Sequence, residues 1–150
     1  MTSLDANLLL YACNEDSPWH GPSWNFVREL GSREDVAISE FVLVELYTLL
    51  RNPSVVTKPL TSVEAVEVIQ SYRHHPHWAL LGFDPDSKGL HEELWRAAKQ
   101  PGFARRRIYD MRMALSLRRQ GVAEFATANM KDFEGFGFKR VWNPVDTGMA

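Results

Sequence analysis

The sequence has a single cysteine, Cys13, among its 150 residues, so it cannot form an intramolecular disulfide. A chain without disulfides suits a reducing compartment. The sequence also lacks any apolar run near the roughly 20 residues that a membrane-spanning helix needs. Its first residues carry no basic segment ahead of an apolar one, as a secretion signal would. We therefore expect a cytoplasmic protein with no membrane segment.

The sequence also lacks a strong charge of either sign. Its formal net charge is −2, so bulk electrostatic attraction to nucleic acid is weak, and any nucleic-acid site must be local or built with a metal or partner. It contains no glycine-rich phosphate loop, no serine nucleophile elbow and no zinc-finger spacing. These absences argue against the common nucleotide-binding, serine hydrolase and zinc-finger classes.

The composition is that of an ordinary globular protein, with 45% hydrophobic and 24% charged residues, and the length suits one domain over residues 1–150. Predicted strands and helices alternate along the chain. This alternation predicts an α/β fold with a central, mostly parallel sheet covered on both faces by helices. Strands are expected up to Leu4–Asp5 and over 36–39, 78–83, 124–127 and 140–142; helices are expected over 8–12, 19–30, 40–52, 61–72, 90–100 and 108–121.

Two helix starts carry recognisable capping signals. Asp16-Ser17-Pro18 predicts a helix that begins there, with Asp16 or Ser17 as the cap and Pro18 in the first turn. Thr61 and Glu64 have the spacing of a capping box, in which each side chain binds the other residue's backbone N–H.

Three carboxylates stand where predicted strands pass into helices or where helices begin. Asp5 ends the first strand, Glu45 lies one to two turns into the helix after the second strand, and Asp110 lies in the first turns of the helix before strand 124–127. Asn129 follows that strand, with Asp132 just beyond. Because the carboxyl ends of parallel strands face one crevice, we expect Asp5 and Asn129 to meet there, with the two helices supplying Glu45 and Asp110.

Such a cluster of carboxylates is electrostatically unfavourable unless a cation or protons neutralise it. Mg²⁺ prefers oxygen ligands, and a bound metal can activate water and stabilise charge on a phosphate. The residues taken singly leave a simpler interpretation open. Asp5 can be a helix cap, Glu45 a solvated helix residue, and Asp132 a surface or capping residue.

Two other clusters have competing interpretations. Arg105, Arg106 and Arg107, with Arg112, could bind RNA phosphates if Asp110 faces the crevice, although a charge run is more often a solvated surface. The segment 74–77 contains three histidines but no partner cysteine, and its proline breaks helical spacing, so a polar loop is favoured over a metal site.

Four segments, in order, resemble the motifs of PIN domains, above all those of VapC-type toxins from toxin–antitoxin pairs. The first contains Asp5, the second Glu45, the third Asp110 and the fourth Asn129. Together they cover nearly the whole chain. They are residues 3–12, 38–46, 109–114 and 125–133, and Arg51-Asn52-Pro53 and Asn143-Pro144 also fit the pattern.

The resemblance implies a PIN domain with a three-layer α/β/α fold that cleaves RNA with Mg²⁺ or Mn²⁺. It implies that Asp5, Glu45 and Asp110 are the catalytic metal ligands and that Asn129 completes the site. It also implies dimerisation, here as a homodimer, and inhibition by a cognate antitoxin protein. Many family members have aspartate where this chain has Asn129, which supplies a carbonyl oxygen but no charge.

Supporting roles and alternative functions stay open at this point. Asn7, Ser39 and Thr127 fit family positions that hold the acidic ligands by hydrogen bonds, and each also suits a turn or a cap. The short chain favours a toxin over a PIN nuclease of RNA processing or DNA repair. A non-catalytic PIN-fold binding module is the third possibility, which the intact acidic set disfavours and Asn129 leaves open.

Overall fold

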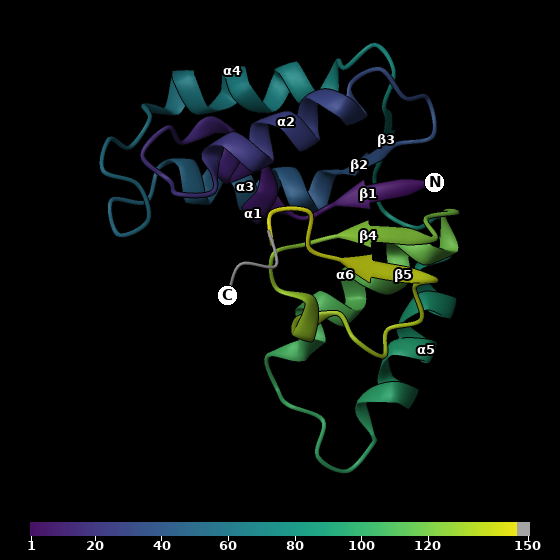
Figure 1. Ribbon diagram of the computed structural model, residues 1–150. Coiled ribbons are helices and arrows are strands. Elements are labelled where there is room, and N and C mark those ends of the chain that lie inside the picture. Colours follow the sequence, from purple (N-terminus) through teal and green to yellow (C-terminus); the bar gives the residue numbers. More distant parts are fainter. Residues whose placement is uncertain (147–150) are drawn as a thin grey trace.

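Strands and helices alternate along residues 1–146, the part of the chain that the computed structural model describes (Figure 1). The last four residues of the predicted domain, 147–150, lie outside it. Each predicted helix and strand is present to within a few residues. The strands are β1 (Thr2–Leu4), β2 (Ala37–Ser39), β3 (Ala79–Leu81), β4 (Glu124–Ala126) and β5 (Arg140–Trp142); the helices are α1 (Ala6–Cys13), α2 (His20–Leu30), α3 (Glu40–Leu50), α4 (Ser62–Arg73), α5 (Ser87–Ala98) and α6 (Arg107–Arg119), with a short 3₁₀ helix, η1 (Met130–Asp132), after β4.

All strand pairs of the described residues are parallel. One sheet has the order β1-β4-β5, and β2 pairs with β3 in a second. A bridge between Thr2 and Val36 and a hydrogen bond of 2.8 Å from the Thr2 N–H to the Asp35 carbonyl join β1 to the residues just before β2. The strands therefore follow the order β3-β2-β1-β4-β5, and the predicted α/β class with a mostly parallel sheet is confirmed.

The core forms where the strands meet the helices that cover them. Leu4 of β1, Leu9 of α1, Ile38 of β2 and Phe125 of β4 have no exposed surface. In Figure 1, α1 to α4 gather beside β1, β2 and β3, whereas α5 and α6 lie behind β4 and β5. The carboxyl ends of β1 and β4 are left facing the same edge of the sheet.

The capping box at α4 is confirmed, whereas the predicted cap of α2 is wrong. The Thr61 hydroxyl accepts from the Glu64 N–H at 3.2 Å, and the Glu64 carboxylate accepts from the Thr61 N–H at 2.9 Å. Helix α2 instead begins at His20, with Trp19 at the cap position and no side-chain cap. Its third residue is Pro22. Proline lacks an N–H and fits only the first turn of a helix, so Pro22 marks this start more reliably than Asp16 or Ser17.

The histidines of segment 74–77 belong to a polar turn that packs on aromatic rings. The His75 ring stacks on Trp78 with centroids 4.2 Å apart, and the His75 Nδ1 accepts from the His77 N–H at 3.1 Å. This arrangement agrees with the polar-loop interpretation. Among residues 1–146, no helix is long and apolar enough to cross a membrane.

Candidate active site at the acidic edge of the sheet

Asp5 occupies the first position after β1, at the edge where β1 and β4 both end. Leu4 pairs with Ala126, and the Asp5 N–H donates to the Ala126 carbonyl at 2.9 Å. The next residue along β4, Thr127, is therefore held beside Asp5. The Asp5 side chain also begins α1, because its Oδ1 accepts from the Ala6 N–H at 2.8 Å. Asp5 is thus a helix cap, as the simpler interpretation held. It also faces the edge where β1 and β4 end, which we call the acidic edge because the charges of Glu45, Asp110 and Asp132 act there as well.

Both oxygens of the Asp5 carboxylate are fixed by neighbours. While Oδ1 caps α1, Oδ2 accepts from the Thr127 hydroxyl at 2.8 Å. The same hydroxyl accepts from the Asn129 N–H at 3.0 Å. Thr127 has no exposed surface and Asp5 is 6% exposed. Thr127 therefore sets the orientation of the carboxylate, the supporting role that the resemblance implied for it.

The surroundings of Asp5 disfavour its charged form. The pKa of Asp5 is raised to about 6, mainly by burial and also by the charges of Glu45 and Asp132, which together outweigh the lowering effect of the Thr127 and Ala6 hydrogen bonds. A buried carboxylate with two acidic neighbours is poised either to take up a proton or to bind a cation.

Asp110 and Glu45 share this electrostatic environment. Asp110 lies in the first turn of α6, and burial followed by the charges of Asp5 and Asp132 raises its pKa to about 6, partly offset by Arg107. Glu45 presents its side chain to solvent from the second turn of α3, yet partial burial and then the charge of Asp110 raise its pKa. The structure therefore brings Asp5, Glu45 and Asp110 within electrostatic reach of one another.

The position of Glu45 follows from how β2 passes into α3. Ser39 ends β2, and its hydroxyl accepts from the Phe41 N–H at 3.1 Å, which caps α3. The helix then runs directly from the strand and carries Glu45 past the end of the sheet. Ser39 therefore acts as a helix cap, one of the two roles that the sequence left open for it.

Asp132 joins the acidic edge, although the sequence slightly favoured a surface role for it. Asp132 ends η1 and is exposed, and its charge raises the pKa of both Asp5 and Asp110. The Asp132 N–H donates to the Asn129 carbonyl at 3.1 Å, which closes the turn after β4 and turns η1 toward the edge.

Asn129 takes part in the acidic edge through its backbone N–H. Its N–H binds the Thr127 hydroxyl, whereas its exposed side chain makes no hydrogen bond within residues 1–146. The side-chain oxygen of the nearby Asn7 accepts from the Ala128 N–H at 3.4 Å and ties α1 to the same turn. The structure places Asn129 beside Asp5 through Thr127 but shows no direct contact between the Asn129 side chain and a carboxylate.

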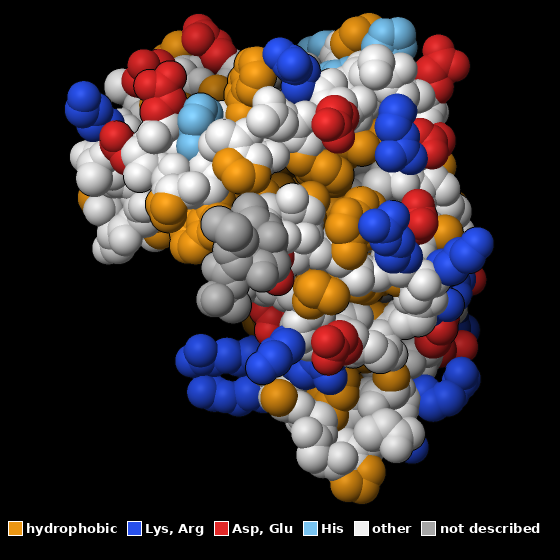
Figure 2. All heavy atoms as spheres, in the orientation of Figure 1, with side chains coloured by type: hydrophobic (Ala, Val, Ile, Leu, Met, Phe, Trp, Pro, Cys, Tyr) orange, Lys and Arg blue, Asp and Glu red, His pale blue; other side chains and the backbone are white. Residues whose placement is uncertain are grey.

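The arginines before α6 divide into two groups. Arg107 is held in place, because it donates to the Glu134 carbonyl at 2.7 Å and lies over the Phe136 ring at 4.3 Å. Arg105 and Arg106 are exposed. Figure 2 shows Lys and Arg side chains projecting beside the start of α6 and η1, with acidic side chains next to them. Arg105 and Arg106 therefore remain available for phosphates, whereas Arg107 is engaged within the protein.

The donor set of the edge suits a hard, hydrated cation. All four acidic groups offer carboxylate oxygens, the ligand type that Mg²⁺ and Mn²⁺ prefer. Among residues 1–146, however, no three His, Cys, Asp or Glu side chains are arranged so that they could hold an ion. An ion at this edge would therefore be bound directly by one or two carboxylates and through water by the others, which is usual for Mg²⁺.

Comparisons with known proteins agree with this fold. No protein-family model matches the sequence. The structure resembles VapBC2 from Rickettsia felis bound to a promoter DNA fragment, with a TM-score of 0.66 and 19% identity over 95% of this chain and 97% of that one. It also resembles the sarcin–ricin loop cleaving toxin VapC20 from Mycobacterium tuberculosis, with a TM-score of 0.61 and 16% identity over 83% and 87%. At these identities the likeness concerns the fold alone, which is that of the PIN-domain toxins.

Sequence similarity narrows the assignment. The chain is 51% identical over 145 residues to Ribonuclease VapC24 of Mycobacterium tuberculosis, covering 97% of each chain, in two strains. It belongs to the VapC family of ribonucleases.

Proposed function

We propose that this protein is a metal-dependent endoribonuclease that acts as the toxin of a toxin–antitoxin pair. The observation that carries the proposal is the acidic edge itself. Asp5 is almost fully buried, and this burial, together with the charges of Glu45 and Asp132, raises its pKa to about 6. Such an arrangement is unfavourable for the protein alone and becomes favourable when a divalent cation neutralises it. A ribonuclease relative of 51% identity supports RNA as the substrate.

Asp5, Glu45 and Asp110 are the proposed ligands of a Mg²⁺ or Mn²⁺ ion. When bound, the ion would lower the pKa of a water molecule and neutralise charge on the attacked phosphate. The protein's own groups prepare the site. Thr127 and the Ala6 N–H hold the Asp5 carboxylate in one orientation, so little reorganisation is needed when RNA binds.

Two further groups complete the proposed site. Asn129 is the group expected to position water, because its side-chain carbonyl oxygen lies on the same turn as Thr127 and has no partner within residues 1–146. Asp132 supplies the negative charge that Asn129 lacks, since it acts on both Asp5 and Asp110. Arg105 and Arg106, on the flank of the edge, would bind RNA phosphates.

The partner of the protein follows from its relatives. VapBC2 was crystallised bound to a DNA fragment from its promoter, and VapC20 is described as a toxin. We infer that this chain pairs with a cognate antitoxin protein. The expected homodimer stays a prediction, which light scattering of the purified protein would test.

The competing functions predict different outcomes. A PIN nuclease of RNA processing or DNA repair would need no antitoxin for the host cell to tolerate it. A non-catalytic module would cut no RNA with any divalent metal. The 51% identity to a named ribonuclease over nearly the whole chain favours catalysis.

The decisive experiment measures RNA cleavage by purified protein freed of any antitoxin, with Mg²⁺, with Mn²⁺ and with a chelator. Cleavage is expected with metal alone, and Asp5→Asn should reduce it by more than the roughly 10–100-fold loss typical of groups that only orient a ligand. Asp35→Asn is the matched control, because Asp35 is exposed, pairs with Arg33 at 2.6 Å and lies just before β2, at the opposite end of the strands from Asp5. Equal cleavage by Asp5→Asn and wild type, or cleavage in chelator, would overturn the proposal.

A further inference from the structure

A hollow opens between α3, α5 and α6, beside the acidic edge, and its volume suits a single aromatic ring. It measures about 150 Å³ and is lined in part by Phe41, Phe83, His91 and Arg112. A cavity of roughly 150 Å³ engineered into another protein accepts one benzene molecule. This hollow is therefore large enough for a ring of pyrimidine size and too small for a folded segment of peptide.

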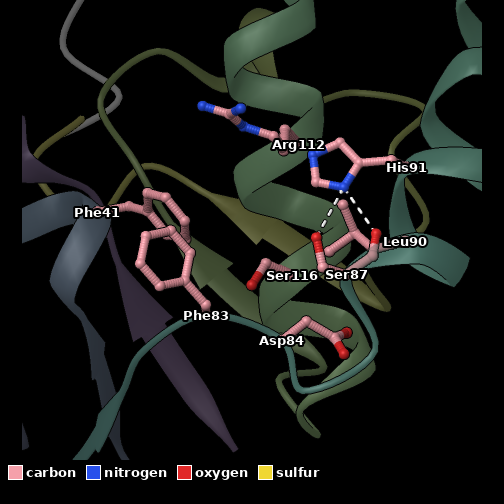
Figure 3. Close-up of a pocket in the computed structure, with 8 residues that line it drawn as sticks. All are labelled: Phe41, Phe83, Asp84, Ser87, Leu90, His91, Arg112 and Ser116. Carbon is pink, nitrogen blue, oxygen red and sulfur yellow. Dashed lines mark hydrogen bonds between the residues drawn. The ribbon is translucent and has the colours of Figure 1, made fainter.

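Two phenylalanines form one flank of the hollow. The rings of Phe41 and Phe83 meet edge to face, with centroids 5.2 Å apart and planes at 84°. Figure 3 shows them together on one side of the hollow, with His91 and Ser87 on the other. Phe83 is 83% exposed, the highest value among the large hydrophobic side chains of residues 1–146. A flat ring left open to solvent beside a ring-sized hollow is a stacking surface for a base.

Polar groups on the other side of the hollow have free hydrogen-bonding capacity. The His91 Nδ1 lies 2.7 Å from the Ser87 backbone carbonyl, and because a carbonyl only accepts, Nδ1 must carry the proton. In the neutral ring, Nε2 is then an acceptor. Arg112 is exposed, and its guanidinium makes no hydrogen bond or ion pair within residues 1–146. The His91 Nε2 thus offers an acceptor and Arg112 offers a cationic group with several donors, whereas the Asp84 carboxylate on the same lining is held by Arg119.

Two of the three helices around the hollow, α3 and α6, also carry residues of the acidic edge. Phe41 stands four residues before Glu45 on α3, about 6 Å along the helix axis and on the same face. Arg112 stands two residues after Asp110 on α6, about 3 Å along the helix axis, and projects from a different side of that helix. A nucleotide adjacent to a phosphate at the acidic edge is therefore within reach of the hollow.

We propose that this hollow binds one pyrimidine base of the RNA, in the nucleotide next to the phosphate that is cut. The base would stack on Phe83 against the edge of Phe41. Arg112 would donate to a carbonyl oxygen of the base, and the His91 Nε2 would accept from the N3–H of uracil or the exocyclic amine of cytosine. The proposal rests on the proposed ribonuclease function and adds a source of sequence preference to it.

The test uses full-length protein and a pool of random-sequence oligoribonucleotides, with the ends of the cleaved products sequenced. Wild type should prefer a pyrimidine at one position beside the cut. Phe83→Ala should lose that preference and lower kcat/KM for the preferred RNA by about 5- to 150-fold, the range expected for one stacked base. Cleavage of the other sequences should stay the same. Phe83→Tyr should retain the preference. Trp95→Ala is the matched control, because Trp95 is an exposed aromatic residue of α5 that does not line the hollow.

Several outcomes would overturn the proposal. These are an unchanged preference in Phe83→Ala, a loss spread equally over all sequences, or full rescue by Phe83→Leu, which is apolar but cannot stack. Weaker antitoxin binding by Phe83→Ala with unchanged RNA preference would assign the hollow to the antitoxin instead.

A binding measurement separates this proposal from the proposed function. Titration with uridine 5′-monophosphate, followed by nuclear magnetic resonance, should shift the ring signals of Phe83 and His91 in wild type more than adenosine 5′-monophosphate does, and Arg112→Ala should weaken that binding. If RNA is cut but neither the shifts nor the preference appear, the base site is wrong and the ribonuclease function stands. If no RNA is cut with any metal, the ribonuclease function fails first.

Discussion

Replacing Asp5 with asparagine should make the protein more stable without metal while removing its activity. The pKa of Asp5 rises from 3.8 to about 6 in the folded protein, a shift of about 2 units. Each unit corresponds to roughly 1.4 kcal/mol, so the charged carboxylate costs the folded state about 3 kcal/mol at pH 8. Asparagine removes the charge but weakens the hydrogen bonds from Thr127 and the Ala6 N–H, by about 1–2 kcal/mol in total. A net gain of about 1–2 kcal/mol remains.

The assay is thermal unfolding followed by circular dichroism, in chelator, at pH 8 and pH 5. For a chain of this length the gain corresponds to a rise in Tm of roughly 2–8 °C at pH 8. Because the folded pKa is raised, the penalty on the carboxylate is complete above pH 6 and disappears as the pH falls toward 3.8. The advantage of Asp5→Asn should therefore shrink at pH 5. Added Mg²⁺ or Mn²⁺ should reverse the order, because only wild type keeps all three carboxylate ligands.

Asp35→Asn is again the control, because the pKa of Asp35 is shifted in the opposite direction from that of Asp5. The hydrogen bond and charge of Arg33 lower the pKa of Asp35, so its carboxylate favours the folded state above its unfolded pKa. This variant should gain no stability at pH 8. The reasoning is refuted if Asp5→Asn unfolds at a lower temperature than wild type at pH 8 in chelator, or if its advantage is the same at both pH values.

Three further predictions concern groups around the edge. Thr127→Val should lower RNA cleavage by about 10–100-fold, with the deficit eased at high metal concentration, because the hydroxyl orients a proposed ligand; unchanged kinetics would contradict this role. Arg119→Ala should lower the midpoint of urea unfolding, since Arg119 binds Asp84 at 2.7 Å and Asp86 at 2.9 Å and so ties the start of α5 to α6; an unchanged midpoint would count against it. Arg105→Ala with Arg106→Ala should raise KM for RNA and flatten its salt dependence with little change in kcat, and an equal fall in kcat would place these arginines in the chemical step.

The sequence predicts the elements of this fold well because its signals are local. The short segments 36–39 and 124–127, which contain β-branched or aromatic residues, favour buried strands, and the Thr61–Glu64 box marks its helix directly. The start of α2 was misplaced because several polar residues compete as caps there. Pro22, a backbone constraint and not a side-chain preference, decides that start.

The candidate site was predictable only in part, because convergence is a property of the tertiary fold. The predicted strand ends and helix starts indicated Asp5, Glu45 and Asp110, and the resemblance implied their role as metal ligands. The turn that directs the charge of Asp132 toward Asp5 depends on a backbone hydrogen bond to Asn129, which no spacing rule shows. The hollow at Phe83 could not be predicted from the sequence for the same reason, since its walls come from three helices that are distant in sequence.

The join between the two parts of the sheet has a consequence for how the protein responds to a cation. Within residues 1–146, one backbone bridge links β1 to the chain before β2, so this join has few amide bonds to resist opening. Asp5 lies on one side of the join and Glu45 on the other. An ion that both carboxylates bind would act as a clamp across it. Amide hydrogen exchange at Thr2, whose N–H group binds the Asp35 carbonyl across the join, should therefore slow when Mg²⁺ or Mn²⁺ is added.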